Sequence, residues 1–119
     1  MIPIPAPLQS RSNVSDLKKR LDWGEPALTI IDVRDRDAFN ASHITGAISI
    51  PMDELVDRAL DNFELVRDIY IYGATEEETV LAVTKLRVAE YQNVAELLGG
   101  LAAWKAAGYP IEGSFTVVA

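Results

Sequence analysis

The chain has 119 residues, of which 49% are hydrophobic and 24% are charged. A chain of this length and composition is expected to fold as one domain with a substantial hydrophobic core. Its apolar runs are too short to span a bilayer, and the N-terminus lacks the basic start and apolar block of a signal peptide. We therefore expect a cytoplasmic protein without a membrane segment.

The formal net charge is −7, from 18 acidic and 11 basic residues. A nucleic-acid binder needs a basic face that neutralises phosphates, so we expect no nucleic-acid partner. The chain contains no cysteine and a single histidine, His43. These counts exclude disulfides, thiolate catalysis and thiolate metal sites within this chain, and we expect no cofactor and no metal site.

The N-terminal part of the chain predicts an irregular leader, a helix and a strand. Alternating prolines disfavour a helix within residues 1–12. Residues 14–21 have a helical apolar period with Ser15 as the expected N-cap, and residues 23–26 form a turn. Residues 27–33 are apolar enough to form a strand buried on both faces, as in a parallel sheet.

The middle of the chain predicts two helices separated by a turn and a short strand. Asp35 is the expected N-cap of a short helix over residues 36–40. Residues 43–47 form a turn, and residues 47–50 form a short strand. Residues 53–60 are amphipathic, with acids in the first turn where the helix dipole favours them.

The C-terminal half predicts the central strand over Asp68–Tyr72 and the longest helix over residues 75–90. A strand over Val94–Leu97 and a helix over residues 101–107 follow, and residues 115–118 are either an edge strand or a tail. On the helix over residues 53–60 and on the longest helix, the residues expected to be buried are Leu55, Val56, Leu60, Val80, Val83 and Leu86. Because strands alternate with helices, the sequence predicts an α/β fold with a mostly parallel sheet.

The junction after the central strand is the first candidate for a functional site. The strand ends at Gly73, and the helical pattern begins at Thr75. Many α/β proteins use such a junction for anion binding or catalysis. This one contains no cysteine, serine or lysine nucleophile, and it carries three consecutive acids, Glu76, Glu77 and Glu78.

Two motifs that flank this junction resemble the signatures of rhodanese-like domains. The first comprises Ile31-Asp32-Val33-Arg34, Phe39, Ser42-His43-Ile44, Gly46-Ala47 and Ile50-Pro51, with Ser42 standing where a glycine is usual. The second is Leu98-Gly99-Gly100-Leu101-Ala102-Ala103-Trp104-Lys105-Ala106-Ala107-Gly108-Tyr109-Pro110. The resemblance covers residues 14–112, which leaves residues 1–13 as an extended leader and residues 113–119 as a C-terminal tail.

The resemblance implies a single α/β unit with a five-stranded, mostly parallel central sheet flanked by helices. Active members of the family carry a cysteine at the end of the central strand, which accepts a sulfane sulfur from a donor such as thiosulfate and passes it on. That position falls on Gly73, and the family's frequent arginine near the end of the loop falls on Glu78. Persulfide transfer needs a thiolate, so we expect no thiosulfate sulfurtransferase chemistry.

The acidic run allows two interpretations. Thr75 with Glu78 fits a capping box, and acids in a first helical turn lie against the positive end of the dipole, so the run favours a helix start that no longer binds an anion. In the alternative, a basic partner or a cation recognises the loop, whose residues are Gly73, Ala74, Thr75, Glu76, Glu77 and Glu78.

Three polar residues of the first motif are further candidates. Asp32 stands at the carboxyl end of a strand, the position of a phosphoacceptor in some α/β domains, but the surrounding motif favours a structural role. Arg34 is predicted to make a salt bridge or to position the loop, and it is the best cationic candidate near the former pocket. His43 is predicted to make a structural hydrogen bond within its turn.

Together these features predict a catalytically inactive rhodanese-like domain that acts as a binding or regulatory module for an unidentified protein partner. The candidate binding residues are the loop over residues 73–78 with Asp32 and Arg34. The alternative is a sulfurtransferase-related enzyme or sulfur-relay component that relies on a partner's cysteine or on Asp32 and Arg34. A third interpretation is a structural interaction domain whose former pocket has no role.

Overall fold

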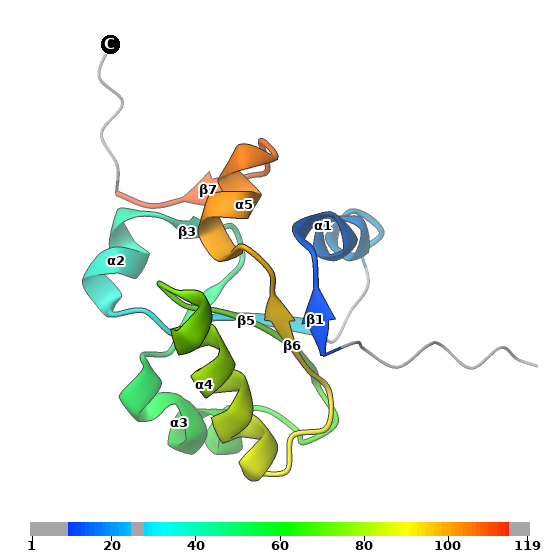
Figure 1. Ribbon diagram of the computed structural model, residues 1–119, viewed down its shortest axis with the longest axis vertical. Helices are drawn as coiled ribbons and strands as arrows, with labels where there is room; N and C mark the ends of the chain where they lie inside the picture. Colours follow the sequence, from blue (N-terminus) through cyan, green and yellow to red (C-terminus); the bar gives the residue numbers. More distant parts are fainter. Residues whose placement is uncertain (1–9, 25–27, 115–119) are drawn as a thin grey trace, which may run out of the picture.

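The computed structural model describes residues 10–24 and 28–114, and its centre is a five-stranded sheet whose strands all run parallel (Figure 1). The strands, in their order across the sheet, are β1 (Arg11–Ser12), β6 (Val94–Leu97), β5 (Asp68–Tyr72), β2 (Leu28–Asp32) and β4 (Ile48–Ser49). The prediction of an α/β fold with a parallel sheet and residues 68–72 at its centre is therefore confirmed.

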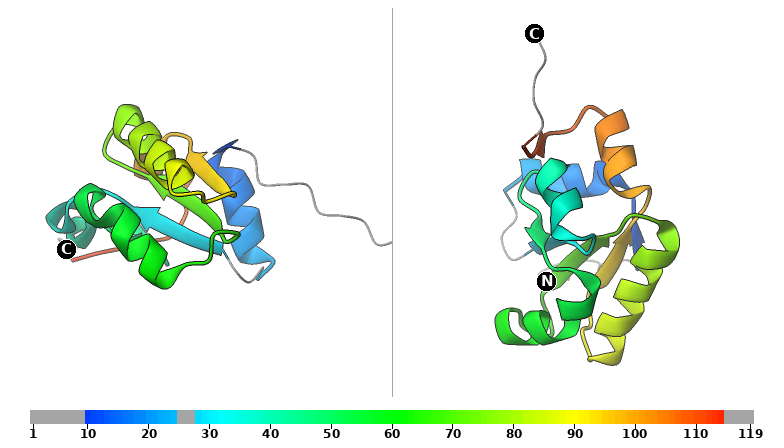
Figure 2. Two further views of the ribbon diagram at one scale, coloured as in Figure 1. Left: turned by 90° about the horizontal axis from the view of Figure 1, so that it is seen from below. Right: turned by 90° about the vertical axis from the view of Figure 1, so that its left-hand side faces the viewer.

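Helices cover both faces of this sheet (Figure 2). The pair α3 (Leu55–Asn62) and α4 (Glu76–Val88) packs on one face, and the pair α1 (Val14–Asp22) and α5 (Gly100–Ala106) packs on the other. The remaining elements are the short helix α2 (Arg36–Ala41), the 3-10 helix η1 (Met52–Glu54), and the antiparallel pair β3 (His43–Ile44) and β7 (Ile111–Glu112).

The two-residue period of β5 divides the core into two layers. Ile69 and Ile71 pack toward α3 and α4, whereas Tyr70 and Tyr72 pack toward α1 and α5. All four side chains are buried, as expected for a central strand covered on both faces. Because this alternation ends at Tyr72, the next residue leaves the sheet at its carboxyl edge, where the loop before α4 begins.

Two N-terminal predictions need correction, and His43 and Ile44, expected within a turn, form strand β3. Arg11 and Ser12, expected within an irregular leader, form the edge strand β1, which pairs with Glu96 and Leu97. The N-cap of α1 is Asn13, whose Oδ1 accepts the Asp16 N–H at 2.8 Å, rather than Ser15. The strand pair β3–β7 was not predicted, because two-residue strands have no period that a sequence pattern can show.

The buried stripes of two helices are shifted from their predicted positions. Leu60 and Val80, expected in the core, are exposed, and Ala59 and Thr79 take the buried positions instead. On α4 the buried residues are Thr79, Ala82, Val83 and Leu86, which is the three-four spacing of one helical face. Leu60 and Val80 therefore lie on the outer surface of these helices, and Val56, also expected in the core, is only half-buried.

Some predictions lie outside the described residues. The turn over residues 23–26 is described only to Gly24, and the predicted edge strand or tail over residues 115–118 is not described. The boundaries of the leader and the tail therefore stay predictions. None of the helices in the described part of the chain has the length and apolar composition needed to cross a bilayer.

Candidate functional site

The candidate site lies at the carboxyl edge of the sheet, between β5 and α4. Thr75 is the N-cap of α4, and its Oγ1 accepts the Glu78 N–H at 3.1 Å, so the predicted cap is confirmed. Thr79 is buried one turn further, where its Oγ1 accepts the Gly73 N–H at 2.8 Å and donates to the Thr75 carbonyl at 3.0 Å. Two N–H groups of the loop are therefore satisfied by hydroxyls of the chain itself.

The space above Gly73 is taken by the side chain of Glu78. A Cβ atom on Gly73 would lie 3.0 Å from Glu78 Cγ and 3.1 Å from Glu78 Oε1. Both distances are shorter than an ordinary van der Waals contact, which begins at about 3.5 Å between carbon atoms. A side chain at position 73 would therefore meet the carboxylate of Glu78 unless that group moved.

A pocket of about 260 Å³ opens beside the loop. Gly73, Ala74, Thr75 and Glu76 line one side of it, and the loop before α5 lines the other. That second wall depends on glycine: Gly99 has φ +75°, and a Cβ there would lie 2.5 Å from Ala103 Cβ. The pocket is therefore open, and backbone forms much of its lining.

Besides Glu76, this pocket has two charged groups within the described part of the chain, which come from strands that the sequence did not connect with the site. Arg11 of β1 and Glu96 of β6 both line the pocket. Arg11 Nη2 lies 3.4 Å from Glu76 Oε1, and Arg11 Nε lies 3.5 Å from Glu96 Oε2. Glu96 is a buried acid within a strand whose other residues are apolar. An acid in such a strand is the feature of the sequence that could have pointed to it.

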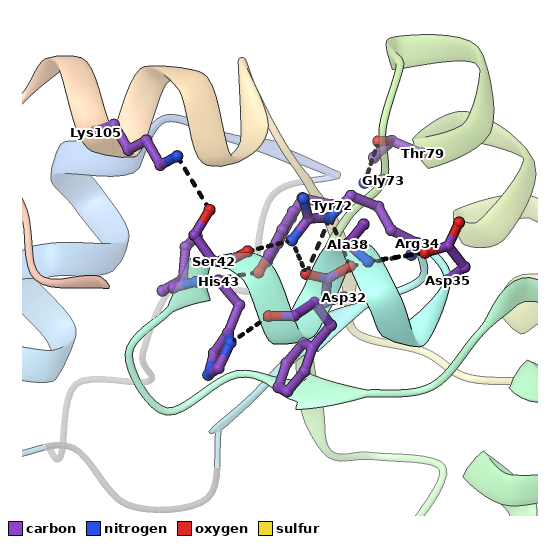
Figure 3. A network of polar contacts seen from close by, with 12 residues as sticks. Asp32, Arg34, Asp35, Ala38, Ser42, His43, Tyr72, Gly73, Thr79 and Lys105 are labelled. Carbon is purple, nitrogen blue, oxygen red and sulfur yellow. Dashed lines mark hydrogen bonds and ion pairs between the residues drawn. The ribbon is translucent and has the colours of Figure 1, made fainter. Parts of the chain in front are cut away.

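Asp32 and Arg34 form a separate network next to the loop (Figure 3). Asp32 is fully buried, and its carboxylate accepts hydrogen bonds from the backbone N–H and the guanidinium of Arg34, the shortest at 2.6 Å. Arg34 also donates to the Ser42 carbonyl at 2.7 Å, so it ties the end of β2 to the start of β3. The hydrogen bond to Asp32 raises the pKa of Arg34 above its ordinary value.

Tyr72 joins this network from the central strand. Its hydroxyl accepts the Ile44 N–H at 3.1 Å, and its ring lies 5.6 Å from the Arg34 guanidinium carbon. Burial raises the pKa of the Tyr72 hydroxyl well above its ordinary value, and the neighbouring Asp32 carboxylate adds to this shift. The network therefore holds β2, β3 and β5 together just below the loop.

The structure brings together only part of the predicted site. Residues 73–76 line the pocket, whereas Glu77 and Glu78 line a shallow surface depression with Asp53 and Leu81. Asp32 and Arg34 lie below the loop and pair with each other, so among the described residues the cation at the pocket is Arg11 instead. His43 Nδ1 lies 2.8 Å from the Phe39 carbonyl of α2, so its structural contact is with this helix and not within the turn for which it was predicted.

This geometry retains a strand, a loop and a helix N-terminus around an open pocket, but the position after β5 has no side chain that could carry sulfur. The family model for the rhodanese-like domain matches residues 13–107. The chain belongs to the rhodanese-like domain family, and it is a member without a cysteine.

Solved structures and curated relatives support this assignment. The crystal structure of the Alr3790 protein from Anabaena is 55% identical, with a TM-score of 0.85 over 88% of this chain and 94% of that one. The HTH-type transcriptional regulator Rv0324 of Mycobacterium tuberculosis is 37% identical over 82% of this chain. The putative sulfur carrier protein YrkF of Bacillus subtilis is 28% identical over 73% of this chain. The chain spans 42% of the regulator and 46% of the carrier protein.

Proposed function

We propose that this chain is a catalytically inactive rhodanese-like domain that acts as a binding or regulatory module. The observation that carries the proposal is Gly73 at the end of β5, with the side chain of Glu78 lying over it. Sulfur transfer by this family's chemistry needs a thiolate at that position, and the whole chain contains no cysteine. The loop therefore lacks the nucleophile, and a side chain at position 73 would displace Glu78 by a small distance.

The charges around the loop support the same proposal. Glu76, Glu77 and Glu78 place negative charge where an anionic sulfur donor would have to approach. The guanidinium of Arg34, the cation that the first motif suggested for the former pocket, is held by Asp32. The loop thus disfavours binding of thiosulfate, and its acids suit recognition by a basic group of a partner. In this proposal residues 73–78 contact the partner, and Asp32 and Arg34 support the loop.

The relatives support a regulatory role within a larger protein. One of them is a transcriptional regulator of which this chain matches less than half, so a domain of this kind accompanies a DNA-binding function there. A second candidate function is a sulfur relay in which a partner supplies the cysteine. The open pocket of about 260 Å³ beside Gly73 and the relative described as a sulfur carrier favour this candidate.

Two assays on the purified chain test the proposal. We expect thiosulfate:cyanide sulfurtransferase activity no higher than that of the heat-denatured chain, and no radiolabelled sulfane sulfur bound to the protein. Turnover above the denatured control contradicts catalytic inactivity. A persulfide-carrying partner protein whose sulfur transfer to cyanide is accelerated by this chain, and not by an Arg34→Ala variant, supports the relay instead.

The role of the loop is tested separately. Once a protein partner is in hand, a triple variant with Glu76, Glu77 and Glu78 changed to alanine should lose affinity for it if the loop is the recognition surface. A matched control changes the exposed acids Asp57, Asp61 and Glu64 to alanine. Equal affinity of both variants and the unmodified chain would assign binding to another surface.

A further inference from the structure

The outer surface of α3 and α4 carries apolar side chains that the core does not use. Leu60, Val80, Leu81 and Val88 are exposed by 53%, 45%, 49% and 80%. These are four of the eight large apolar side chains that are exposed among the described residues. The two helices lie side by side on one face of the sheet, so their exposed residues form one surface (Figure 2).

This surface is hollowed along the length of α4. Near the C-terminal end of the helix, a depression of about 560 Å³ is lined by Val56 and Leu60 of α3, by Thr84, Lys85 and Val88 of α4, and by Ala89 directly after it. The next depression shares Thr84 and continues to Leu81. We call the surface defined by Val56, Leu60, Leu81, Thr84 and Val88 the α3–α4 groove. On α4, Leu81, Thr84 and Val88 follow the three-four spacing of a single helical face.

One end of the groove is strongly acidic. The depressions around Leu81 are also lined by five carboxylates: Asp35, Asp53, Glu76, Glu77 and Glu78. Within the described part of the chain, Glu76 is the member of this set that makes an ion pair, with the exposed Arg11. Asp35 also caps α2, where its Oδ1 accepts the Ala38 N–H at 2.8 Å. Within the described residues Asp53, Glu77 and Glu78 make no ion pair, so these three carboxylates are available to a cationic partner. The opposite end, at Val56, Leu60 and Val88, is lined mainly by apolar groups, with Lys85 as its cation.

We propose that the α3–α4 groove binds an amphipathic helix of a partner protein, with apolar residues along one face and lysine or arginine at the end that meets the carboxylates. The 13 residues of α4 span about 20 Å, which matches a partner helix of three to four turns. A second copy of this chain is a poorer occupant, because each copy carries a net charge of −7. The inference names the surface and the partner chemistry of the binding role proposed above, and it rests on that role.

Two synthetic helical peptides of three to four turns test the groove directly. Both peptides carry leucine along one face of the helix. At the remaining positions the basic peptide has lysine and the acidic peptide has glutamate. Two-dimensional NMR spectra of the isotopically labelled chain should show amide shifts confined to α3 and α4 on addition of the basic peptide. Fluorescence anisotropy should give a dissociation constant at least about tenfold lower for the basic peptide than for the acidic one, and this difference should shrink at high salt.

Variants on the exposed surface locate the contact without disturbing the core. Val88→Asp should raise the dissociation constant of the basic peptide by about tenfold or more, because it replaces an apolar contact at the apolar end of the groove with a charge that binding would desolvate. Glu77→Lys should weaken the basic peptide and strengthen the acidic one. The control is Val66→Asp, since Val66 is exposed by 56% but lies outside the groove, and it should leave both constants unchanged.

Three outcomes overturn the inference: no binding of the basic peptide, equal binding by the Val88→Asp variant, or amide shifts at residues 73–75 instead of the groove. Sedimentation that shows a dimer, which Val88→Asp dissociates, assigns the groove to a second copy and also overturns it. Sulfurtransferase activity is measured on the same samples, so turnover with intact peptide binding would refute catalytic inactivity while leaving the groove standing.

Discussion

The side chain of Glu78 lies over Gly73, where a Cβ atom would be 3.0 Å from Glu78 Cγ. The family resemblance implies that the cysteine of active rhodanese-like domains falls on this position and that an arginine is frequent at the position of Glu78. Here the two departures fit each other, because the glycine leaves space that the glutamate fills. Restoring one residue without the other therefore places a thiol against a carboxylate.

Gly73→Cys alone should restore little sulfurtransferase activity. The Glu78 carboxylate next to the new thiol raises the thiol pKa and repels thiosulfate. The double change Gly73→Cys with Glu78→Arg should be at least about tenfold more active, the effect of roughly one pKa unit on the thiolate fraction. The pH dependence of alkylation by iodoacetamide measures the thiol pKa in each variant.

The control for that comparison is Gly73→Cys with Glu64→Arg, which makes the same charge change at an exposed residue outside the loop. It should behave like Gly73→Cys alone. High activity of the single variant, or equal activity of the two double variants, would show that Glu78 does not govern the loop.

Thr79→Val should destabilise the chain by about 1–3 kcal/mol, because it leaves the Gly73 N–H without the hydroxyl that accepts it at 2.8 Å. Thr84→Val is the matched control: Thr84 lies on the same helix, is exposed, and its hydroxyl only donates to the Val80 carbonyl at 2.8 Å. Urea denaturation measures both free energies of unfolding, and hydrogen exchange should be faster at the Gly73 amide in the Thr79 variant alone. Equal losses in the two variants would show that the Gly73 hydrogen bond contributes nothing.

The sequence predicted those strands and helix starts that depend on residues close to one another in the chain. The apolar run of Asp68–Tyr72 marks a buried strand, and Thr75 followed by three glutamates marks a helix start. The two faces of β5 follow from its period of two, which placed Tyr70 and Tyr72 together. The two family motifs added the expectation of a five-stranded, mostly parallel sheet, which is confirmed.

What the sequence did not predict depends on contacts between distant segments. Arg11 meets Glu96 only because β1 pairs with β6, and two residues of strand carry no period to reveal this. The inner stripe of α4 was displaced because Thr79 is buried as a hydrogen-bond partner of Gly73, so the helix turns Val80 outward. A hydroxyl that satisfies a backbone group outweighed the hydrophobicity of its neighbour.

Asp32→Ala should destabilise the chain by about 3–5 kcal/mol, since it leaves the mostly buried Arg34 guanidinium without its carboxylate. The control is Glu54→Ala, which removes the exposed ion pair between Glu54 and Arg36 and should have a much smaller effect. Thermal and urea denaturation measure both. If Asp32→Ala costs no more than the control, the pair is not structural, and Asp32 becomes a candidate for a functional role.

Tyr72→Phe should destabilise the chain at neutral pH and do so less at alkaline pH. At neutral pH the variant loses the hydrogen bond from the Ile44 N–H, a cost of about 1–3 kcal/mol for a buried donor left unpaired.

Burial raises the pKa of Tyr72 in the folded chain, so the stabilising effect of Tyr72 is fully present below its pKa in the unfolded chain and is lost as the pH rises through its pKa in the folded chain. Above about pH 10, ionisation of Tyr72 stabilises only the unfolded state of the unmodified chain, and phenylalanine has no such ionisation. The difference in unfolding free energy between the two proteins, measured in urea from about pH 8 to about pH 11, should therefore shrink above about pH 10. A difference that stays constant across this range would mean that Tyr72 ionises as easily in the folded chain as in the unfolded one.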